Sequence, residues 1–146
     1  GSKTETDQAM KVDSKGAGPV ESLDSKPLRI SEGRTTEGML PVYFNYDSSD
    51  VRKDQVARVE VNADFIKKST KYEVRIEGNC DPRGTNEYNM ALGERRAQSA
   101  KKYLMNLGVS EAKLSTVSYG EERLLLQGQD EMSWAQNRRA DFVVVQ

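Results

Sequence analysis

One acidic and one basic side chain form a pair that could bind a ligand. Asp81 lies in a polar loop, and Arg96 lies on the long helical pattern that follows it. A carboxylate accepts hydrogen bonds from an ammonium group, and the planar guanidinium of an arginine binds a carboxylate with two parallel bonds. The pair therefore predicts a pocket for a zwitterion that carries both groups, such as the free end of an amino acid.

The elements on either side of this loop should hold the two side chains in place. Residues 72–77 alternate between apolar and charged side chains, which predicts a strand with one buried face. Pro82 and Gly84 form a turn after the strand, and Thr85 or Asn86 can cap the helix that comes next. A strand, a turn and a capped helix make a fixed frame for the loop.

The predicted helix carries an apolar stripe with a second group of side chains beside it. Steps of three and four residues define the stripe: Met90, Gly93, Ala97, Ala100, Leu104 and Leu107. At about 100° per residue, Asn89, Leu92 and Arg96 fall together beside this stripe, at the end nearest the loop. We expect Asp81 and Arg96 to face solvent, so that replacing either one should cost little stability.

The remaining segments complete one predicted domain. They comprise a strand in which Val42, Phe44 and Tyr46 share one side, a helix capped by Asp54 with apolar positions from Val56 to Ile66, a strand over 113–119, a short helix over 130–137 anchored by Trp134, and a strand over 140–145. Gly108 should end the central helix. Strands separated by helices require crossover connections and some parallel pairing. The sequence thus predicts an α/β (α+β) fold, a two-layer sandwich with helices on one face of a mixed four-stranded sheet.

Composition excludes several kinds of site. A formal net charge of −1 and a pI of about 5.7 give no general attraction to nucleic acid. The chain has one cysteine and no histidine, so it cannot form an internal disulfide, a histidine-ligated zinc site or a serine-histidine triad. We expect Cys80 to be a small side chain of the loop without a reactive role, and we predict no metal and no cofactor.

The N-terminal segment differs from the rest of the chain. Residues 1–27 are rich in small, polar and charged side chains, which predicts a flexible tether, and Gly1-Ser2 resembles the remnant of an expression tag. Residues 28–146 form the predicted domain, which begins with a docked loop over 28–39. No stretch of the sequence is long and apolar enough to suggest a membrane-spanning helix.

A longer motif surrounds the charge pair. Residues 78–96 read Gly-Asn-Cys-Asp-Pro-Arg-Gly-Thr-Asn-Glu-Tyr-Asn-Met-Ala-Leu-Gly-Glu-Arg-Arg. This resembles the Gly-x-x-Asp-x-Arg-Gly-Thr-x-Glu-Tyr-Asn-x-x-Leu-Gly-x-Arg-Arg pattern of the OmpA-like peptidoglycan-binding domain, and within that family the peptidoglycan-associated lipoproteins of Gram-negative bacteria. Shorter matches at 42–47, 117–122 and 137–140 extend the resemblance over about residues 40–146. Many members carry an aspartate where this chain has Asn45.

The resemblance implies a non-catalytic domain that binds the diaminopimelate-containing stem peptide of peptidoglycan. The side-chain end of diaminopimelate carries the ammonium and carboxylate groups inferred above. The implied pocket consists of Tyr46, Asp47, Asp81, Arg83, Thr85, Asn89, Leu92 and Arg96, with Asn137 and Arg138 as possible supports behind it. The resemblance also implies an upstream lipid anchor in the outer membrane, a periplasmic location, and partners from the Tol system such as TolB.

Two other functions are compatible with the sequence. An enzyme acting on the same polymer could use Asp81 with Asp47 or Glu87 as an acid and base pair. Such an aspartate would stay ionised beside an arginine, which makes it a poor acid. Alternatively, an OmpA-like domain of another envelope protein could act mainly in protein–protein interaction, for example through the apolar cluster 124–126.

Overall fold

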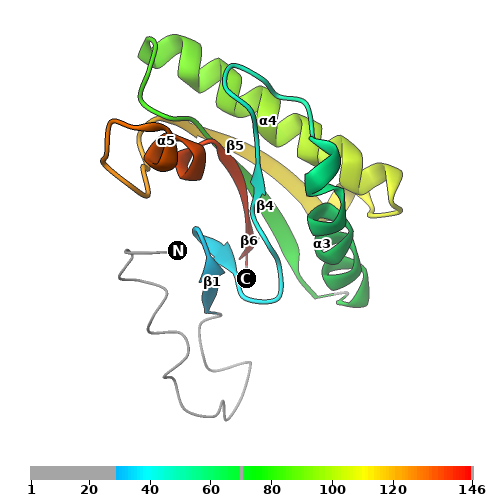
Figure 1. The fold of residues 1–146 in the computed structure, drawn as a ribbon. Helices are drawn as coiled ribbons and strands as arrows, with labels where there is room; N and C mark the ends of the chain where they lie inside the picture. Colours follow the sequence, from blue (N-terminus) through cyan, green and yellow to red (C-terminus); the bar gives the residue numbers. More distant parts are fainter. Residues whose placement is uncertain (1–28, 70, 146) are drawn as a thin grey trace.

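A computed structural model describes residues 29–69 and 71–145, so the predicted tether lies outside the described residues. Its main sheet has the order β3 (Val42–Tyr43), β6 (Arg139–Val145), β4 (Glu73–Asn79) and β5 (Leu114–Gly120). β6 is antiparallel to β3 and β4, whereas β4 and β5 are parallel. The predicted mixed four-stranded sheet is confirmed (Figure 1).

Two helices cover one face of this sheet. α4 (Asn86–Asn106) crosses between β4 and β5 as the predicted parallel connection, and α3 (Val56–Lys68) packs beside it (Figure 1). The hydrophobic core lies between the sheet and these helices. Its residues include Val42, Phe44, Val59, Ala63, Ile66, Val74, Ile76, Ala97, Ala100, Leu104, Ala140 and Phe142. Gly108 ends α4 with a positive φ of 101°, as predicted.

The caps of the two long helices differ from each other. Thr85 caps α4, because its side chain accepts a hydrogen bond from the backbone N–H of Tyr88. Asp54 was expected to cap α3, and this expectation is wrong. The helix has no side-chain cap, and it is preceded by a 3-10 turn, η1 (Lys53–Gln55). The carboxylate of Asp54 instead binds the guanidinium of Arg52 at 2.9 and 2.7 Å.

The first predicted strand is shorter than expected. Val42 and Phe44 are buried as predicted, but β3 ends at Tyr43, and Tyr46 is 60% exposed. The chain turns after β3, and in this turn Asp47 adopts a left-handed backbone with φ 54°. Tyr46 is therefore carried away from the core on a turn.

The segment before β3 forms a hairpin rather than the predicted docked loop. β1 (Ile30–Glu32) pairs with β2 (Thr35–Thr36). The hydroxyls of Thr35 and Thr36 accept hydrogen bonds from the N–H groups of Phe142 and Val144, at 3.1 and 3.0 Å. The hairpin thus covers the edge of β6 where β3 is too short to reach. Strands of two or three residues are too short to show the alternation of apolar and polar side chains by which a strand is predicted.

The last helix, α5 (Glu131–Asn137), lies beside the start of β6, away from α3 and α4 (Figure 1). Asp130 caps it by accepting from the N–H of Ser133 at 2.9 Å. The side-chain amide of Asn137 binds the backbone of Leu125 and Leu126. The cluster 124–126 is therefore half-buried and fixed against the domain.

Candidate functional site

A pocket of about 50 Å³ lies between the turn at 45–48, the loop after β4 and the first half of α4. It is lined by Tyr46, Asp47, Cys80, Asp81, Arg83, Gly84, Tyr88, Asn89, Leu92 and Arg96. Seven of the eight residues predicted for the pocket are in this set. The exception is Thr85, which caps α4. Asp81 and Arg96 share one cavity, as the sequence predicts.

Asp81 is a buried carboxylate with two arginine partners. It is 4% exposed, and its oxygens accept from the backbone N–H, Nε and Nη2 of Arg83 at 3.0, 3.1 and 2.8 Å. Nη1 of Arg138 lies 3.7 Å away. Burial alone would raise the pKa of Asp81, but the hydrogen bonds and charges of these arginines outweigh burial and lower it. The carboxylate is therefore ionised at neutral pH.

Arg96 is deeply buried, so the prediction that it faces solvent is wrong, as it is for Asp81. Only 1% of Arg96 is exposed. Its Nε, Nη1 and Nη2 donate to the carbonyl oxygens of Ser48, Asn79 and Asn45 at 2.8, 2.9 and 3.0 Å. Burial lowers the pKa of its guanidinium, which nonetheless stays cationic at neutral pH because an arginine titrates so far above it. Arg96 thus joins the 45–48 turn to the end of β4.

The burial of Arg96 still leaves it able to bind a ligand. A guanidinium carries five N–H donors, and three of those of Arg96 are accounted for by the backbone carbonyls. Arg96 also lines the pocket, and two of its N–H donors are not used by these three carbonyls. Met90 was predicted as part of the apolar stripe of α4 and is 38% exposed, so this part of the prediction is wrong, whereas Asn89 and Leu92 beside the stripe are buried.

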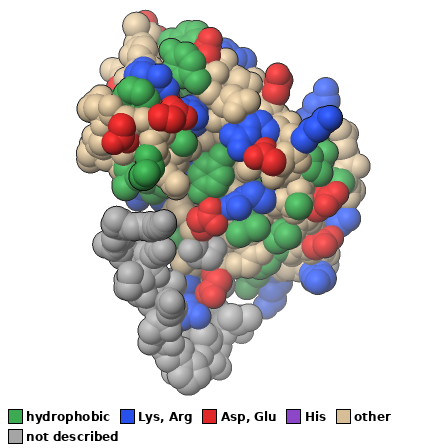
Figure 2. Space-filling view, in the orientation of Figure 1, with side chains coloured by type: hydrophobic (Ala, Val, Ile, Leu, Met, Phe, Trp, Pro, Cys, Tyr) green, Lys and Arg blue, Asp and Glu red, His purple; other side chains and the backbone are tan. Residues whose placement is uncertain are grey.

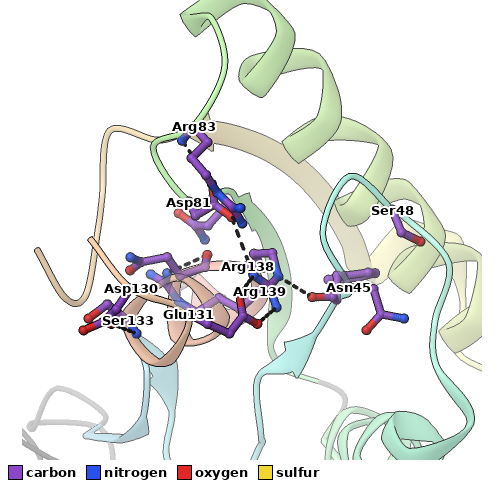
Figure 3. Close-up of polar contacts among 12 residues, drawn as sticks. Asn45, Ser48, Asp81, Arg83, Asp130, Glu131, Ser133, Arg138 and Arg139 are labelled. Atoms are coloured by element: carbon purple, nitrogen blue, oxygen red, sulfur yellow. Dashed lines mark hydrogen bonds and ion pairs between the residues drawn. The ribbon is translucent and has the colours of Figure 1, made fainter. Parts of the chain in front are cut away.

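Arg83 lies over Asp81 between two aromatic rings. Its guanidinium carbon is 4.1 Å from the ring centre of Tyr46 and 3.9 Å from that of Trp134 in α5. Figure 3 shows Arg83, Asp81 and Arg138 in sequence from the start of α4 towards α5. The contact with Trp134 was not predicted, because nothing in the sequence relates residue 134 to the loop.

Arg138 lies beside Asp81 and does not itself line the pocket. Its Nε donates to the carbonyl oxygen of Phe44 at 2.9 Å, and its other nitrogens bind Glu131 at 3.2 and 2.8 Å. Asn137, which was paired with it in the prediction, does not line the pocket, and its amide is used by the loop at 125–126.

Two side chains close one side of the pocket mouth. The hydroxyl of Tyr88 donates to Oδ1 of Asp47, which joins α4 to the 45–48 turn. This hydrogen bond raises the pKa of Tyr88, so its phenol stays protonated. Sequence reasoning did not assign Tyr88 a role, although it lies within the matched motif.

Asn89 holds the loop in its bent form. Its Nδ2 donates to the carbonyl oxygen of Arg83 at 2.9 Å and to Oε1 of Glu121 at 2.7 Å. Cys80 is buried beside it, and burial raises the pKa of this thiol to about 11. A raised pKa disfavours the thiolate, which is the reactive form of a cysteine.

A wider and shallower hollow of about 550 Å³ lies over the loop after β5. It is lined by Arg34, Glu121, Glu122, Arg123, Leu124 and Gln127, and contains none of the predicted site residues. The face seen in Figure 2 mixes acidic and basic side chains and shows no broad surface of one charge. The smaller pocket remains the candidate site because it brings opposite charges together in a buried setting.

Across residues 29–69 and 71–145, no group of three or more potential metal ligands comes together. The helices of this described region are also too short or too polar to cross a membrane.

Comparison with known proteins identifies the class of this domain. The model of the OmpA family matches residues 43–138, and the chain belongs to this family. The OmpA-like domain is a peptidoglycan-binding domain and not an enzyme.

More specific likenesses are to peptidoglycan-associated lipoproteins. The protein of that name from Pseudomonas putida is 49% identical over 113 residues, which are 77% of this chain and 68% of the relative. The one from Haemophilus influenzae is 46% identical over 99 residues, 68% of this chain and 65% of the relative. The crystal structure of the peptidoglycan-associated lipoprotein from Burkholderia pseudomallei is 44% identical, with a TM-score of 0.69 over 72% of this chain and 89% of that one.

Proposed function

We propose that the pocket binds peptidoglycan non-covalently through the diaminopimelate of its stem peptide. The observation that carries this proposal is the shared cavity of Asp81 and Arg96. Asp81 would accept hydrogen bonds from the ammonium group of the ligand, and Arg96 would donate its unused N–H groups to the ligand's carboxylate. A few charge-assisted bonds of about 1.5–3 kcal/mol each would give an affinity of about micromolar.

The charges of the site argue against hydrolysis of the polymer. Asp81 is held ionised by Arg83 and Arg138, so it cannot act as a general acid near neutral pH. Of the two carboxylates considered as its partner, Asp47 lines the pocket and accepts a hydrogen bond from the hydroxyl of Tyr88, whereas Glu87 does not line it.

The test is binding to isolated cell walls. Asp81→Asn should abolish pull-down by sacculi, because the uncharged amide cannot pair with an ammonium group. Asp54→Asn is the matched control, since this carboxylate is exposed and outside the pocket. Equal binding by the wild type and Asp81→Asn would overturn the proposal.

Wall chemistry provides a second arm of the test. Walls that carry lysine in place of diaminopimelate lack the carboxylate that Arg96 would bind, so they should not retain the protein. In titration calorimetry, a diaminopimelate tripeptide should bind, whereas the same peptide acetylated on the side-chain amino group of diaminopimelate, which has lost that positive charge, should not. Similar binding to both wall types would refute the assignment of Arg96.

The likeness to lipoproteins supports a proposal for the cellular role. We propose that the domain tethers the outer membrane to the cell wall from its periplasmic side, with an upstream lipid anchor and residues 1–27 as the tether. A Tol-system protein such as TolB would compete for an overlapping face. Capture of TolB that falls as a diaminopimelate peptide is added would support this role, and capture unaffected by saturating peptide would contradict competition. The fixed, half-buried cluster 124–126 does not favour a separate interaction surface.

A further inference from the structure

The side chain of Arg83 already supplies Asp81 with a cation. Its Nε and Nη2 donate to the two carboxylate oxygens at 3.1 and 2.8 Å, which is the fork geometry of a strong arginine–carboxylate pair. The rings of Tyr46 and Trp134 lie on the guanidinium and hold it there. Arg83 therefore takes the position that an incoming ammonium group would need.

The space inside the pocket leads to the same conclusion. The pocket has a volume of about 50 Å³, and the guanidinium of Arg83 occupies the space beside the carboxylate of Asp81. A ligand's ammonium group can reach that carboxylate only if this side chain moves. Asp81 and Arg96 are almost wholly buried, whereas the side chain of Arg83 is 32% exposed. Of the three charged groups Asp81, Arg83 and Arg96, Arg83 is therefore the one best able to move.

We propose that Arg83 is an internal cation that blocks Asp81 in the free protein and must leave before the ligand's ammonium group can bind. This inference rests on the proposed function, and it adds a specificity-determining residue to it. Exchange of one cation for another keeps the buried carboxylate of Asp81 paired throughout. A neutral ligand that displaced Arg83 would leave Asp81 without this partner, and the pocket would reject it.

The displaced guanidinium stays charged and has a carboxylate nearby. Hydrogen bonds to Asp81 raise the pKa of Arg83, and the charge of Glu131 in α5 adds to this rise. The same α5 carries Trp134, whose ring loses its contact with Arg83 when the side chain leaves. Because Trp134 is the only tryptophan of the chain, its fluorescence reports the movement directly.

The variant Arg83→Ala separates a blocking role from a ligand contact. It removes the guanidinium but keeps the backbone N–H that donates to Asp81. If the ligand binds only when Arg83 has left Asp81, the apparent dissociation constant is the intrinsic one divided by the fraction of molecules in that open state. We therefore expect Arg83→Ala to bind a diaminopimelate tripeptide about tenfold more tightly, which corresponds to about 1.4 kcal/mol, and to associate with it faster.

Fluorescence gives a readout that a purely structural role would not move. Saturating tripeptide should change the Trp134 emission of the wild type, and this change should be absent from Arg83→Ala, in which the ring has already lost its partner. Arg75→Ala is the matched control, because Arg75 pairs with Glu77 at 2.9 Å, is similarly exposed at 37%, and lies outside the pocket. It should leave both affinity and emission unchanged.

The outcomes distinguish this inference from the proposed function. Wild-type binding that weakens in Arg83→Ala would show that Arg83 contacts the ligand, and would overturn the inference while the proposed function stands. An unchanged emission of the wild type at saturating tripeptide would also overturn it. If neither the wild type nor Arg83→Ala bound the tripeptide, the proposed function would fail, and the inference with it.

Discussion

Gly78 of β4 and Gly93 of α4 pack backbone against backbone, because a Cβ on Gly78 would lie 1.7 Å from the carbonyl oxygen of Gly93. This contact brings the first half of α4 close to the end of β4. The loop between them, which carries Asp81 and Arg83, is thereby kept short and bent.

Replacing Gly78 by alanine should therefore destabilise the domain strongly. The obstructing atom belongs to the backbone of a helix, so it cannot rotate away, and the layers would have to separate. We expect a loss of about 3 kcal/mol in the free energy of unfolding, measured in urea. Gly128→Ala is the control, since its Cβ meets the Oγ of Ser133, a side chain that can rotate. Similar losses in the two variants would contradict this account.

Replacing Arg96 by alanine should cost folding stability as well as binding. The change leaves the carbonyl oxygens of Asn45, Ser48 and Asn79 without their donor and opens a cavity behind the pocket. A loss of about 3 kcal/mol is expected by urea unfolding. The neighbouring Arg95 is exposed, so Arg95→Ala should change stability by no more than about 0.5 kcal/mol. Stabilities that are indistinguishable between the two variants would show that the carbonyl contacts of Arg96 contribute little.

The contrast between Arg95 and Arg96 illustrates what the sequence could predict. Helical periodicity placed Arg96 on the side of α4 nearest the loop, and it lies there. It could not show that the turn at 45–48 folds over the guanidinium, because that contact joins residues about fifty positions apart. Periodicity describes which residues share a face, whereas burial depends on what the rest of the chain places on that face.

The long strands of the sheet could be predicted because they carry a repeating pattern, which the short turn does not. Strands such as β4 and β6 alternate or are rich in β-branched residues over seven positions, which gives a pattern enough length to be seen. The hairpin of β1 and β2 is held to β6 by single hydrogen bonds that the hydroxyls of Thr35 and Thr36 accept, and the two-residue β3 is followed by a turn in which Asp47 is left-handed. Single hydrogen bonds and turns of this kind produce no periodic pattern in the sequence.

The acid sensitivity of the domain should depend partly on Asp81. Its pKa is lowered in the folded protein, so the stability it contributes is complete above its unfolded pKa of about 3.9 and is lost as the pH falls through the lower folded value. Asp81→Asn should therefore cost about 2 kcal/mol at pH 7, and this difference from the wild type should shrink below about pH 4.

Urea unfolding of both proteins across this pH range provides the measurement. Asp50→Asn, which alters an exposed carboxylate, should differ from the wild type by no more than about 0.5 kcal/mol throughout. A difference between the wild type and Asp81→Asn that stays constant down to acid pH would mean that the lost stability does not come from the ionised carboxylate.

Cys80 should resist modification for as long as the domain is folded. Burial raises the pKa of its thiol to about 11, so on the order of one molecule in a thousand carries a thiolate at pH 8, and the sulfur is also shielded from solvent. Its Sγ lies 3.3 Å from the carbonyl oxygen of Asn89, inside the frame that bends the loop. A chromogenic disulfide reagent should therefore react with the native protein at the rate of its unfolding, and at once after denaturation in guanidinium chloride. Cys80→Ser, which lacks the thiol, gives the background of the assay. Rapid reaction of the native protein would show that the loop opens without global unfolding, and the rigid frame inferred for Asp81 would then be wrong.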